Sequence, residues 1–204
     1  MDERTKQILL GLMLGDGHFT AFYGRSATSA LDMKADSRYL PYLQWLHREL
    51  APIGVSELRP KKNYHQHRFY TKRTKEIGEL RALFYPEGKK IIPDEIKKLL
   101  KSPLSLAVWY QDDGTLDCRD KYHYNALFAT HCFSFDECRL LADTLKENFE
   151  LDVRVAKCRM RNVLRYRLYV VSKSMGKFME LITPYINSCF AYKIRKLSDS
   201  QQQR

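Results

Sequence analysis

Two short runs of almost entirely apolar residues stand out from the mixed pattern of the rest of the chain. Residues 8–17 read ILLGLMLGDG and residues 105–114 read SLAVWYQDDG, so each run ends in an aspartate followed by a glycine. Such a run predicts a helix that is buried on nearly all sides, and it is much shorter than the roughly 20 apolar residues of a membrane span. Because the copies lie almost half a chain length apart, they indicate two copies of one folding unit.

The glycines and aspartates of these runs predict how the two helices meet. Gly11 and Gly15 are four residues apart and share one helix face, and a face without side chains lets a second backbone approach closely. Asp16 and Asp113 fall at the C-terminal, partly negative ends of their helices, where acids are disfavoured. If the helices pack side by side and parallel, the carboxylates converge, and a hard cation such as Mg2+ or Ca2+ would stabilise them. The alternative, that each aspartate only ends a buried helix in solvent, is disfavoured by the match between the copies.

The remaining periodicity predicts the same series of elements in both halves. In the first half we expect a motif helix at residues 5–14, a hairpin at 19–23 and 28–34, a helix at 38–50, a hairpin at 57–61 and 67–72, and a helix near 76–84. In the second half we expect a motif helix at 103–111, a hairpin at 115–118 and 125–131, a helix at 136–149, a hairpin at 153–161 and 164–171, and a helix near 175–183. Ser134 followed by Glu137 resembles the capping box of a helix start. The expected architecture is an α+β fold of two pseudo-symmetric αββαββα repeats, residues 1–100 and 101–204, packed through their motif helices.

The second hairpin of each half alternates between apolar and basic residues, which predicts a half-buried ribbon with one basic face. In the second half, this face is expected to carry Lys157, Arg159, Arg161, Arg165 and Arg167. In the first half, it is expected to carry Arg59, Lys61, Arg68, Tyr70 and Lys72, while His67 and the turn residue Arg25 add further contacts. A solvated charged face is the alternative, but like charges on one ribbon repel, and the pattern recurs in both halves. An anionic partner is therefore favoured, and a two-stranded ribbon fits the major groove of duplex DNA.

Charge and composition agree with a nucleic-acid partner. The 204-residue chain has a net charge of +11 and a pI near 9.4, as expected for a protein that meets a polyanion. A membrane surface is the competing polyanion, but no segment resembles an amphipathic basic anchor or a membrane span.

The cysteines and the N-terminal sequence bear on where the protein works. The five cysteines are an odd number without a Cys-x-x-Cys pair, which indicates free thiols in a reducing compartment and disfavours a zinc site. No signal peptide is evident at the N-terminus, so the protein is not expected to be secreted. We expect it to act in a prokaryotic cytoplasm, or in the mitochondrion or chloroplast that encodes it.

Residues 9–17 resemble the LAGLIDADG motif of the homing endonucleases position by position, and residues 106–114 resemble it more loosely, with departures at Val108 and Asp112. The second copy looks like that of the single-chain branch typified by the omega-intron endonuclease of mitochondria. The resemblance implies a monomeric, site-specific double-strand DNA endonuclease with a saddle of β-ribbons. It also implies hydrolysis of one phosphodiester per strand of a long asymmetric site, leaving 3′ overhangs.

The resemblance also implies roles for individual residues. Mg2+ would be bound by Asp16 and Asp113 and by the backbone carbonyls of Gly15 and Asp112, with Mn2+ or Ca2+ able to substitute in binding. Lys90 and Lys193 match the basic residues that the family places near each site, where they organise the attacking water or stabilise the transition state. The alternative for each is an ordinary surface lysine.

Two other classes of function compete with the enzyme. One is a binding protein, either an RNA maturase that helps its host intron to splice or a DNA-binding relative that no longer cleaves. The other is a structural or regulatory protein that uses only the basic saddle. Both aspartates and both lysines are present, which favours the enzyme. Maturase activity can coexist with cleavage, so double-stranded DNA is the expected partner and host intron RNA a second candidate.

Overall fold

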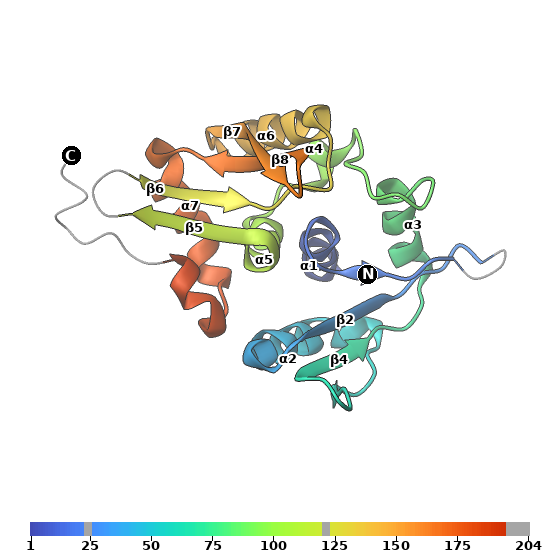
Figure 1. The fold of residues 1–204 in the computed structure, drawn as a ribbon. Coiled ribbons are helices and arrows are strands. Elements are labelled where there is room, and N and C mark those ends of the chain that lie inside the picture. Colours follow the sequence, from blue (N-terminus) through green and yellow to red (C-terminus); the bar gives the residue numbers. More distant parts are fainter. Residues whose placement is uncertain (23–25, 120–122, 195–204) are drawn as a thin grey trace.

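Two parallel helices form the centre of the molecule in a computed structural model that describes residues 1–22, 26–119 and 123–194 (Figure 1). Helix α1 (Glu3–Leu14) begins at Asp2, whose carboxylate accepts the N–H of Thr5 at 2.8 Å. Helix α5 (Pro103–Asp113) begins at Ser102, with a proline in its first turn. Side-chain acceptors at these positions satisfy backbone donors that have no partner within a helix, so each helix starts where the sequence favours it.

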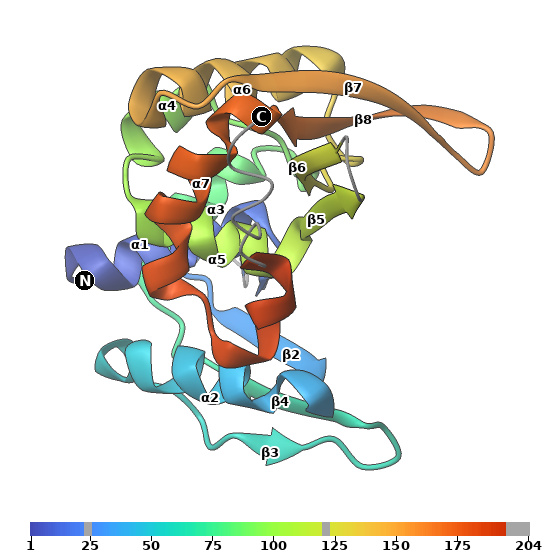
Figure 2. The ribbon, with the colours of Figure 1, turned by 90° about the vertical axis from the view of Figure 1, so that its left-hand side faces the viewer.

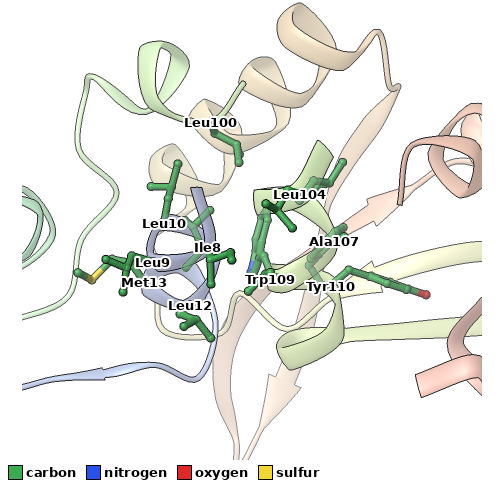
Figure 3. Packing of buried hydrophobic residues seen from close by; sticks show 14 of the residues in the cluster. Ile8, Leu9, Leu10, Leu12, Met13, Leu100, Leu104, Ala107, Trp109 and Tyr110 are labelled. Carbon is green, nitrogen blue, oxygen red and sulfur yellow. The ribbon is translucent and has the colours of Figure 1, made fainter. Parts of the chain in front are cut away.

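The contact between α1 and α5 depends on glycine. A Cβ atom added to Gly11 would lie 2.6 Å from the Cβ of Val108, and one added to Gly15 would lie 2.5 Å from a carboxylate oxygen of Asp112. The helices therefore run in the same direction and approach more closely than side chains on both would allow. Apolar residues fill the rest of the contact, with Trp109 directed toward α1 and Tyr110 directed away from it (Figure 3). This close parallel packing is what the repeated motif predicts.

Each half contributes one four-stranded antiparallel sheet, and both sheets have the same strand order. The first sheet has the order β1-β2-β4-β3, from β1 (His18–Phe19), β2 (Leu31–Asp36), β3 (Arg59–Pro60) and β4 (Gln66–Tyr70). The second has the order β5-β6-β8-β7, from β5 (Gly114–Arg119), β6 (His123–Phe128), β7 (Val153–Met160) and β8 (Val163–Val170). The equal order confirms the predicted α+β fold of two pseudo-symmetric repeats.

Helices pack on one face of each sheet and shield that face from solvent. Helix α2 (Leu40–Glu49) packs on β2 and β4, and α6 (Phe135–Phe149) packs on β7 and β8. The capping box at the start of α6 is present, with Ser134 and Glu137 exchanging hydrogen bonds. The other helices are α3 (Lys75–Phe84), α4 (Ile96–Leu99) and α7 (Met175–Ile182). No helix in the described part of the chain is long and apolar enough to cross a membrane.

Within the described residues, the pairing of the first predicted hairpin of the first half covers fewer positions than predicted. Pairing of β1 with β2 stops at Phe19, because the chain after Thr20 bonds elsewhere: Ser29 forms a bridge with Thr74. The guanidinium of Arg73 donates to the carbonyls of Ala21 and Thr28, at 2.8 and 2.6 Å. The predicted hairpin would have these two carbonyls accept hydrogen bonds from a neighbouring strand. In the structure they accept from the side chain of Arg73 instead. The predicted turn residue Arg25 lies outside the described residues.

The hairpin β7–β8 has a different register from the one predicted. Its turn is Arg161-Asn162, with φ angles of 47° and 63°, and Met160 pairs with Val163. Residues directly opposite each other in an antiparallel pair point to the same face. Arg159 therefore shares a face with Leu164, and Arg165 shares the other face with Cys158. The prediction of a single basic face was wrong, because a two-residue turn pairs odd-numbered positions with even-numbered ones.

Two segments cross from one half to the other. Residues 91–100, which include α4, pack on α6: Asn148 donates to the carbonyls of Lys97 and Leu100, at 2.8 and 2.7 Å. In return, Phe190 in the 3-10 segment Ser188–Ile194 stacks on Tyr39 at 5.0 Å, beside α2. The segment that ends each repeat thus packs on the other repeat. Figure 2 shows the outer hairpins, β3–β4 and β7–β8, projecting on the side of the molecule opposite the N-terminus.

Candidate active site

Asp16 and Asp113 lie at the adjacent C-terminal ends of α1 and α5. Asp16 is exposed just beyond α1, and Asp113 is the partly exposed last residue of α5. Burial, followed by the negative charge of Asp16, raises the pKa of Asp113 to about 6. The carboxylates are therefore close enough to repel each other, as the convergence of parallel helix ends predicts.

Glycine at the start of β5 is required by space and not by backbone conformation. Gly114 has a φ of −81°, which any residue adopts. A Cβ atom at this position would lie 2.1 Å from the ring of Tyr110. Tyr110 in turn donates its hydroxyl to the carbonyl of Lys193 at 3.1 Å. The glycine after the second motif thus lets α5 turn directly into the sheet while Asp113 remains at the surface.

The two predicted lysines lie on the helix ends that carry the acids. Lys90 Nζ donates to the carbonyls of Leu14 and Gly15, at 3.1 and 3.0 Å. Lys193 Nζ donates to the carbonyl of Gln111 at 2.7 Å. Burial lowers the pKa of both ammonium groups, and the nearby aspartates partly offset this effect. Each lysine therefore places a positive charge at the negative end of a helix, where it is favoured.

The side chain of Asp112 turns toward the opposite half. Its carboxylate accepts the backbone N–H of Asp16 at 3.0 Å and the hydroxyl of Tyr42 at 3.0 Å. Burial and the charge of Asp16 raise the pKa of Asp112 to about 8. Adjacent helix positions point about 100° apart, so Asp112 and Asp113 reach different surroundings although they are neighbours in the sequence.

Two hollows flank the acids. One of about 370 Å³ is lined by Asp112, Asp113, Thr115 and Lys193, among others. The other, of about 470 Å³, is lined by residues that include Asp16, Asp112 and Lys193. Each motif aspartate thus borders its own depression, and Lys193 and Asp112 line both.

The donor set around these acids suits a hard cation. It consists of carboxylate and carbonyl oxygens, which Mg2+ and Ca2+ prefer. Burial and then the charge of Asp16 raise the pKa of Asp113, and the charges of Lys90 and Lys193 lower it in part. Among the described residues, no group of three or more His, Cys, Asp or Glu side chains is placed to hold a metal ion. Any divalent ion at Asp16 or Asp113 would therefore complete its coordination with backbone carbonyls, water or a bound substrate.

The basic residues of the first-half ribbon share the outward face of the sheet, as predicted. Arg59 lies opposite Arg68, and Tyr70 lies opposite Asp32 in the neighbouring strand. Arg59 pairs with Glu57 at 2.7 Å, and Arg68 pairs with Asp32 at 2.6 Å. Both arginines are therefore paired with carboxylates of their own half.

Three further predicted contact residues of the first half have different settings. Lys61 lies over the ring of Tyr64, at 4.2 Å from its centroid. Lys72 follows β4 and is exposed. His67 lies on the opposite face, with Pro60 and Ala35 as cross-strand partners, and its Nδ1 is 3.3 Å from the hydroxyl of Ser37. His67 thus faces α2 and not the outward side of the sheet, which argues against the predicted DNA contact.

In the second half, the ribbon carries its basic residues on two faces. Arg165 and Arg167 lie on the face away from α6, and Arg154 joins them opposite Tyr169. Lys157 and Arg159 lie on the face that packs on α6 near the base of the ribbon, but both are exposed. Arg161 is in the exposed turn. The predicted residues of this ribbon are all at the surface. Only Arg165 and Arg167 among them lie on the outward face of the sheet.

Comparison with known proteins identifies the family. A family model described as "LAGLIDADG DNA endonuclease family" matches residues 6–178, which include both motif helices and both sheets. The chain belongs to the LAGLIDADG DNA endonuclease family. The resemblance carried by the two motifs is thereby confirmed.

Individual known proteins are similar over most of the chain. A cytochrome b mRNA maturase bI2 from Debaryomyces hansenii is 27% identical over 95% of this chain and 74% of its own length. The homing endonuclease I-WcaI, solved bound to its DNA recognition sequence, is 21% identical, with a TM-score of 0.78 over 97% of this chain and 88% of that chain. A structure of I-DmoI in complex with DNA and Mn is 15% identical, with a TM-score of 0.53 over 87% of this chain and 95% of that chain. The two structures show that the fold is shared.

The structure adds three polar residues that the sequence patterns did not single out for the site or the ribbon. Tyr42 is buried on α2 and reaches Asp112 of the other half. Gln111 is also buried, and its side chain accepts the backbone N–H of Asn187 at 2.7 Å. Arg154 belongs to the outward face of the second sheet. Had a two-residue turn been predicted at Arg161-Asn162, Arg154 would have been placed on the outward face. No local pattern indicates the long-range partners of Tyr42 and Gln111.

Proposed function

We propose that this LAGLIDADG family member is a site-specific double-strand DNA endonuclease. It hydrolyses one phosphodiester in each strand of a long asymmetric site and leaves 3′ overhangs. The observation that carries the proposal is the convergence of Asp16 and Asp113, one from each half, at adjacent helix ends with a lysine on each helix. A pseudo-symmetric pair of acids suits a substrate with two strands of opposite direction.

Mg2+ would be held by acids and carbonyls from both halves of the molecule. We assign these halves to two repeats, residues 1–100 and 101–204. Asp16 with the carbonyl of Gly15, and Asp113 with the carbonyl of Asp112, are the ligands that the chain offers. The chemistry supplied by such an ion is charge neutralisation at the phosphate and activation of water. The Mn in the I-DmoI complex with DNA supports a divalent ion of this type. Mg2+ itself is our proposal.

The two lysines act on the phosphates of the bonds that are cleaved. Neither lysine depends on Asp16 or Asp113 for its position. Lys90 is held by the carbonyls of Leu14 and Gly15, and Lys193 by that of Gln111. From these positions each ammonium orients the attacking water or stabilises the charge that develops on the phosphate. Because burial lowers the pKa of both groups, they transfer a proton more readily than an exposed lysine would.

The outward faces of the two sheets bind the duplex on both sides of the acids. Arg68 and Arg59 of the first half are oriented by carboxylates, and Arg165 and Arg167 of the second half extend from a longer ribbon. Because the two ribbons differ in length and charge, the protein reads an asymmetric site as a monomer. I-WcaI, of similar fold, was solved bound to its DNA recognition sequence, which supports this mode of binding.

A second candidate function is maturation of a host intron RNA. It is favoured by the similarity to the maturase of Debaryomyces hansenii, which is named for cytochrome b mRNA. That relative also suggests an organelle that encodes the protein as the site of action, beside a prokaryotic cytoplasm. Binding of intron RNA would accompany cleavage and would not replace it, because both motif aspartates are present.

Cleavage of a randomised duplex library tests the proposed function directly. The purified protein is incubated with the library in Mg2+, and the ends of cut molecules are sequenced. We expect one long, non-palindromic consensus with 3′ overhangs, and no cut molecules when EDTA replaces the metal. A protein that binds the library in Mg2+ without cutting any member would contradict the endonuclease and favour the binding protein.

A further inference from the structure

A single carboxylate connects the two halves at the ends of the motif helices. One oxygen of Asp112 accepts the backbone N–H of Asp16 at 3.0 Å, and the other accepts the hydroxyl of Tyr42 at 3.0 Å. Asp112 belongs to α5, whereas Asp16 and Tyr42 belong to the first half. The contact therefore joins the second motif helix to the acid of the first.

The backbone of Asp16 depends on this contact, because the helix provides no acceptor for it. The N–H of Gly15 bonds to the carbonyl of Gly11 at 3.0 Å, and that of Gly17 bonds to the carbonyl of Leu12 at 2.9 Å. The N–H of Asp16, between them, bonds to the side chain of Asp112. The conformation of the residue that carries the acid is thus held from the other half of the molecule.

The contact runs in one direction only. Gly15 occupies in α1 the position that Asp112 occupies in α5, directly before the motif aspartate. A Cβ at Gly15 would lie 2.5 Å from the Asp112 carboxylate, so the space of a side chain there is already filled. Asp113 consequently receives no equivalent support from α1. The two acids are symmetric in the backbone and asymmetric in what positions them.

We propose that Asp112 is a positioning residue that fixes Asp16 of the opposite half, that Tyr42 orients Asp112, and that this contact governs cleavage of only one DNA strand. The inference rests on the proposed function, in which each motif aspartate serves one strand. A shift of Asp16 of about 1 Å is enough to slow a reaction about 100-fold. The strand served by Asp113 does not depend on this contact.

The conservative variant Asp112→Asn separates positioning from a charge-based role. The amide oxygen of asparagine accepts the N–H of Asp16, while its NH2 group donates to the oxygen of Tyr42. The contact is therefore kept, but the side chain can no longer carry a negative charge. Asp112→Ala removes the contact altogether, and Tyr42→Phe removes only its orienting partner.

The experiment follows each strand of the target duplex separately, with a different label on each, in single-turnover cleavage with Mg2+. We expect Asp112→Ala to slow one strand by about 10- to 100-fold and the other by less than about twofold. Tyr42→Phe should slow the same strand by a smaller factor. Asp112→Asn, which keeps an acceptor for the N–H of Asp16, should slow that strand by a smaller factor than Asp112→Ala does.

Two results would overturn the inference. If Asp112→Ala slowed both strands equally, the residue would have a general structural role. If Asp112→Asn were as slow as Asp112→Ala, the charge and not the position would matter. The double variant Asp112→Ala/Tyr42→Phe, which leaves no buried hydroxyl without a partner, repeats the comparison if the single alanine variant unfolds.

Amide hydrogen exchange of Asp16 tests the same contact without cleavage. Exchange should be faster in Asp112→Ala than in the wild type and unchanged in Asp112→Asn. Equal exchange in all three proteins would overturn the inference. A wild-type protein that leaves every duplex intact would instead refute the proposed endonuclease, and the exchange data would still decide whether Asp112 holds Asp16.

Discussion

The outer hairpins of the two halves occupy equivalent places in the fold but differ in how their charge is balanced. In the first half, Arg59 and Arg68 pair with Glu57 and Asp32, at 2.7 and 2.6 Å. In the second half, no ion pair within the described part of the chain involves the ribbon residues Lys157, Arg159, Arg161, Arg165 and Arg167.

One position accounts for much of this difference. Asp32 pairs across the sheet with His18 and Tyr70, and Leu127 pairs in the same way with Thr115 and Tyr169. The second half thus has leucine where the first half has the acid that holds Arg68. A guanidinium fixed by a carboxylate has a defined direction, which suits recognition of a base, whereas a free guanidinium suits phosphate. We infer that the first half contributes more to sequence recognition and the second half more to attraction.

The largest effect should come from removing either motif acid, which would show that the halves are equal in chemistry. We expect Asp16→Asn and Asp113→Asn each to reduce double-strand cleavage at least about 100-fold, because a ligand for the cation is lost. Thermal melting and target binding in Ca2+ should be retained. Full-rate cutting of both strands by either variant would refute the assignment of these acids.

The lysines should give the next largest effect and should separate the halves. Lys90→Met and Lys193→Met each remove one ammonium that stabilises the charge developing on the phosphate, and a loss of about 2 kcal/mol of that stabilisation is about 30-fold in rate. We expect each variant to accumulate plasmid nicked in one strand, and the two variants to nick opposite strands. Both strands can be followed by primer extension from the nicked product. Nicks in the same strand would show that the lysines are not equivalent.

Salt dependence of binding tests the difference between the ribbons. Replacing Arg167 with alanine should lower the slope of log K against log salt by about 1, because a phosphate contact is lost. The double variant Arg68→Ala/Asp32→Ala removes an internally neutral pair and should leave the slope unchanged. Fluorescence anisotropy over a range of salt concentrations measures both.

A matched control for this comparison is Lys146→Ala. Lys146 is exposed on α6, at 3.8 Å from Asp152, on the far side of the second sheet from Arg165 and Arg167. Its removal should leave the slope as it is in the wild type. A slope lowered equally by Lys146→Ala and Arg167→Ala would mean that only net charge matters.

The smallest effect should be a change in the pKa of His131. Burial lowers this pKa from its ordinary value of 6.5, and the charges of Arg167 and Arg165 lower it further. The neutral imidazole is therefore favoured in the folded protein, and its contribution to stability is present above pH 6.5 and lost as the pH falls through the lowered pKa. Arg167→Gln should raise the pKa of His131 toward 6.5, as measured by NMR titration. An unchanged pKa would show that Arg167 is farther from His131 than the structure places it.

Features that depend on local sequence were predicted well. The apolar runs ending in Asp-Gly predicted α1 and α5, and Ser134 with Glu137 predicted the start of α6. Caps, periodicity and turn residues act over a few positions, so they can be read from one sequence. The roles of Asp16, Asp113, Lys90 and Lys193 stay predictions, although the structure places each acid at the end of its helix and each lysine on the carbonyls beside it.

Features that depend on register or on partners far apart in the chain were not predicted. A two-residue turn at Arg161-Asn162 moved Arg165 and Arg167 to the face opposite Lys157 and Arg159. One residue in the length of a turn changes the face of every side chain after it. Likewise, the sequence marked Asp112 as a departure from the motif and as a carbonyl beside Asp113, but it did not predict the partners of the side chain, because these donors on Asp16 and Tyr42 come from the other half.

The sequence by itself determined that the chain is a duplicated fold with one acid per copy. Two buried helices with small residues and terminal aspartates are compatible with few folds other than this one. Apolar helices must bury their faces, and glycines on a shared face allow the two backbones to pack closely. Only the tertiary structure decided what the differences between the copies do. It placed Asp112 against the empty side of Gly15, held Asp16 from across the interface and paired Arg68 but not Arg167 with an acid. Those differences arise where two halves meet or two strands pair, and such contacts have no signature in either half alone.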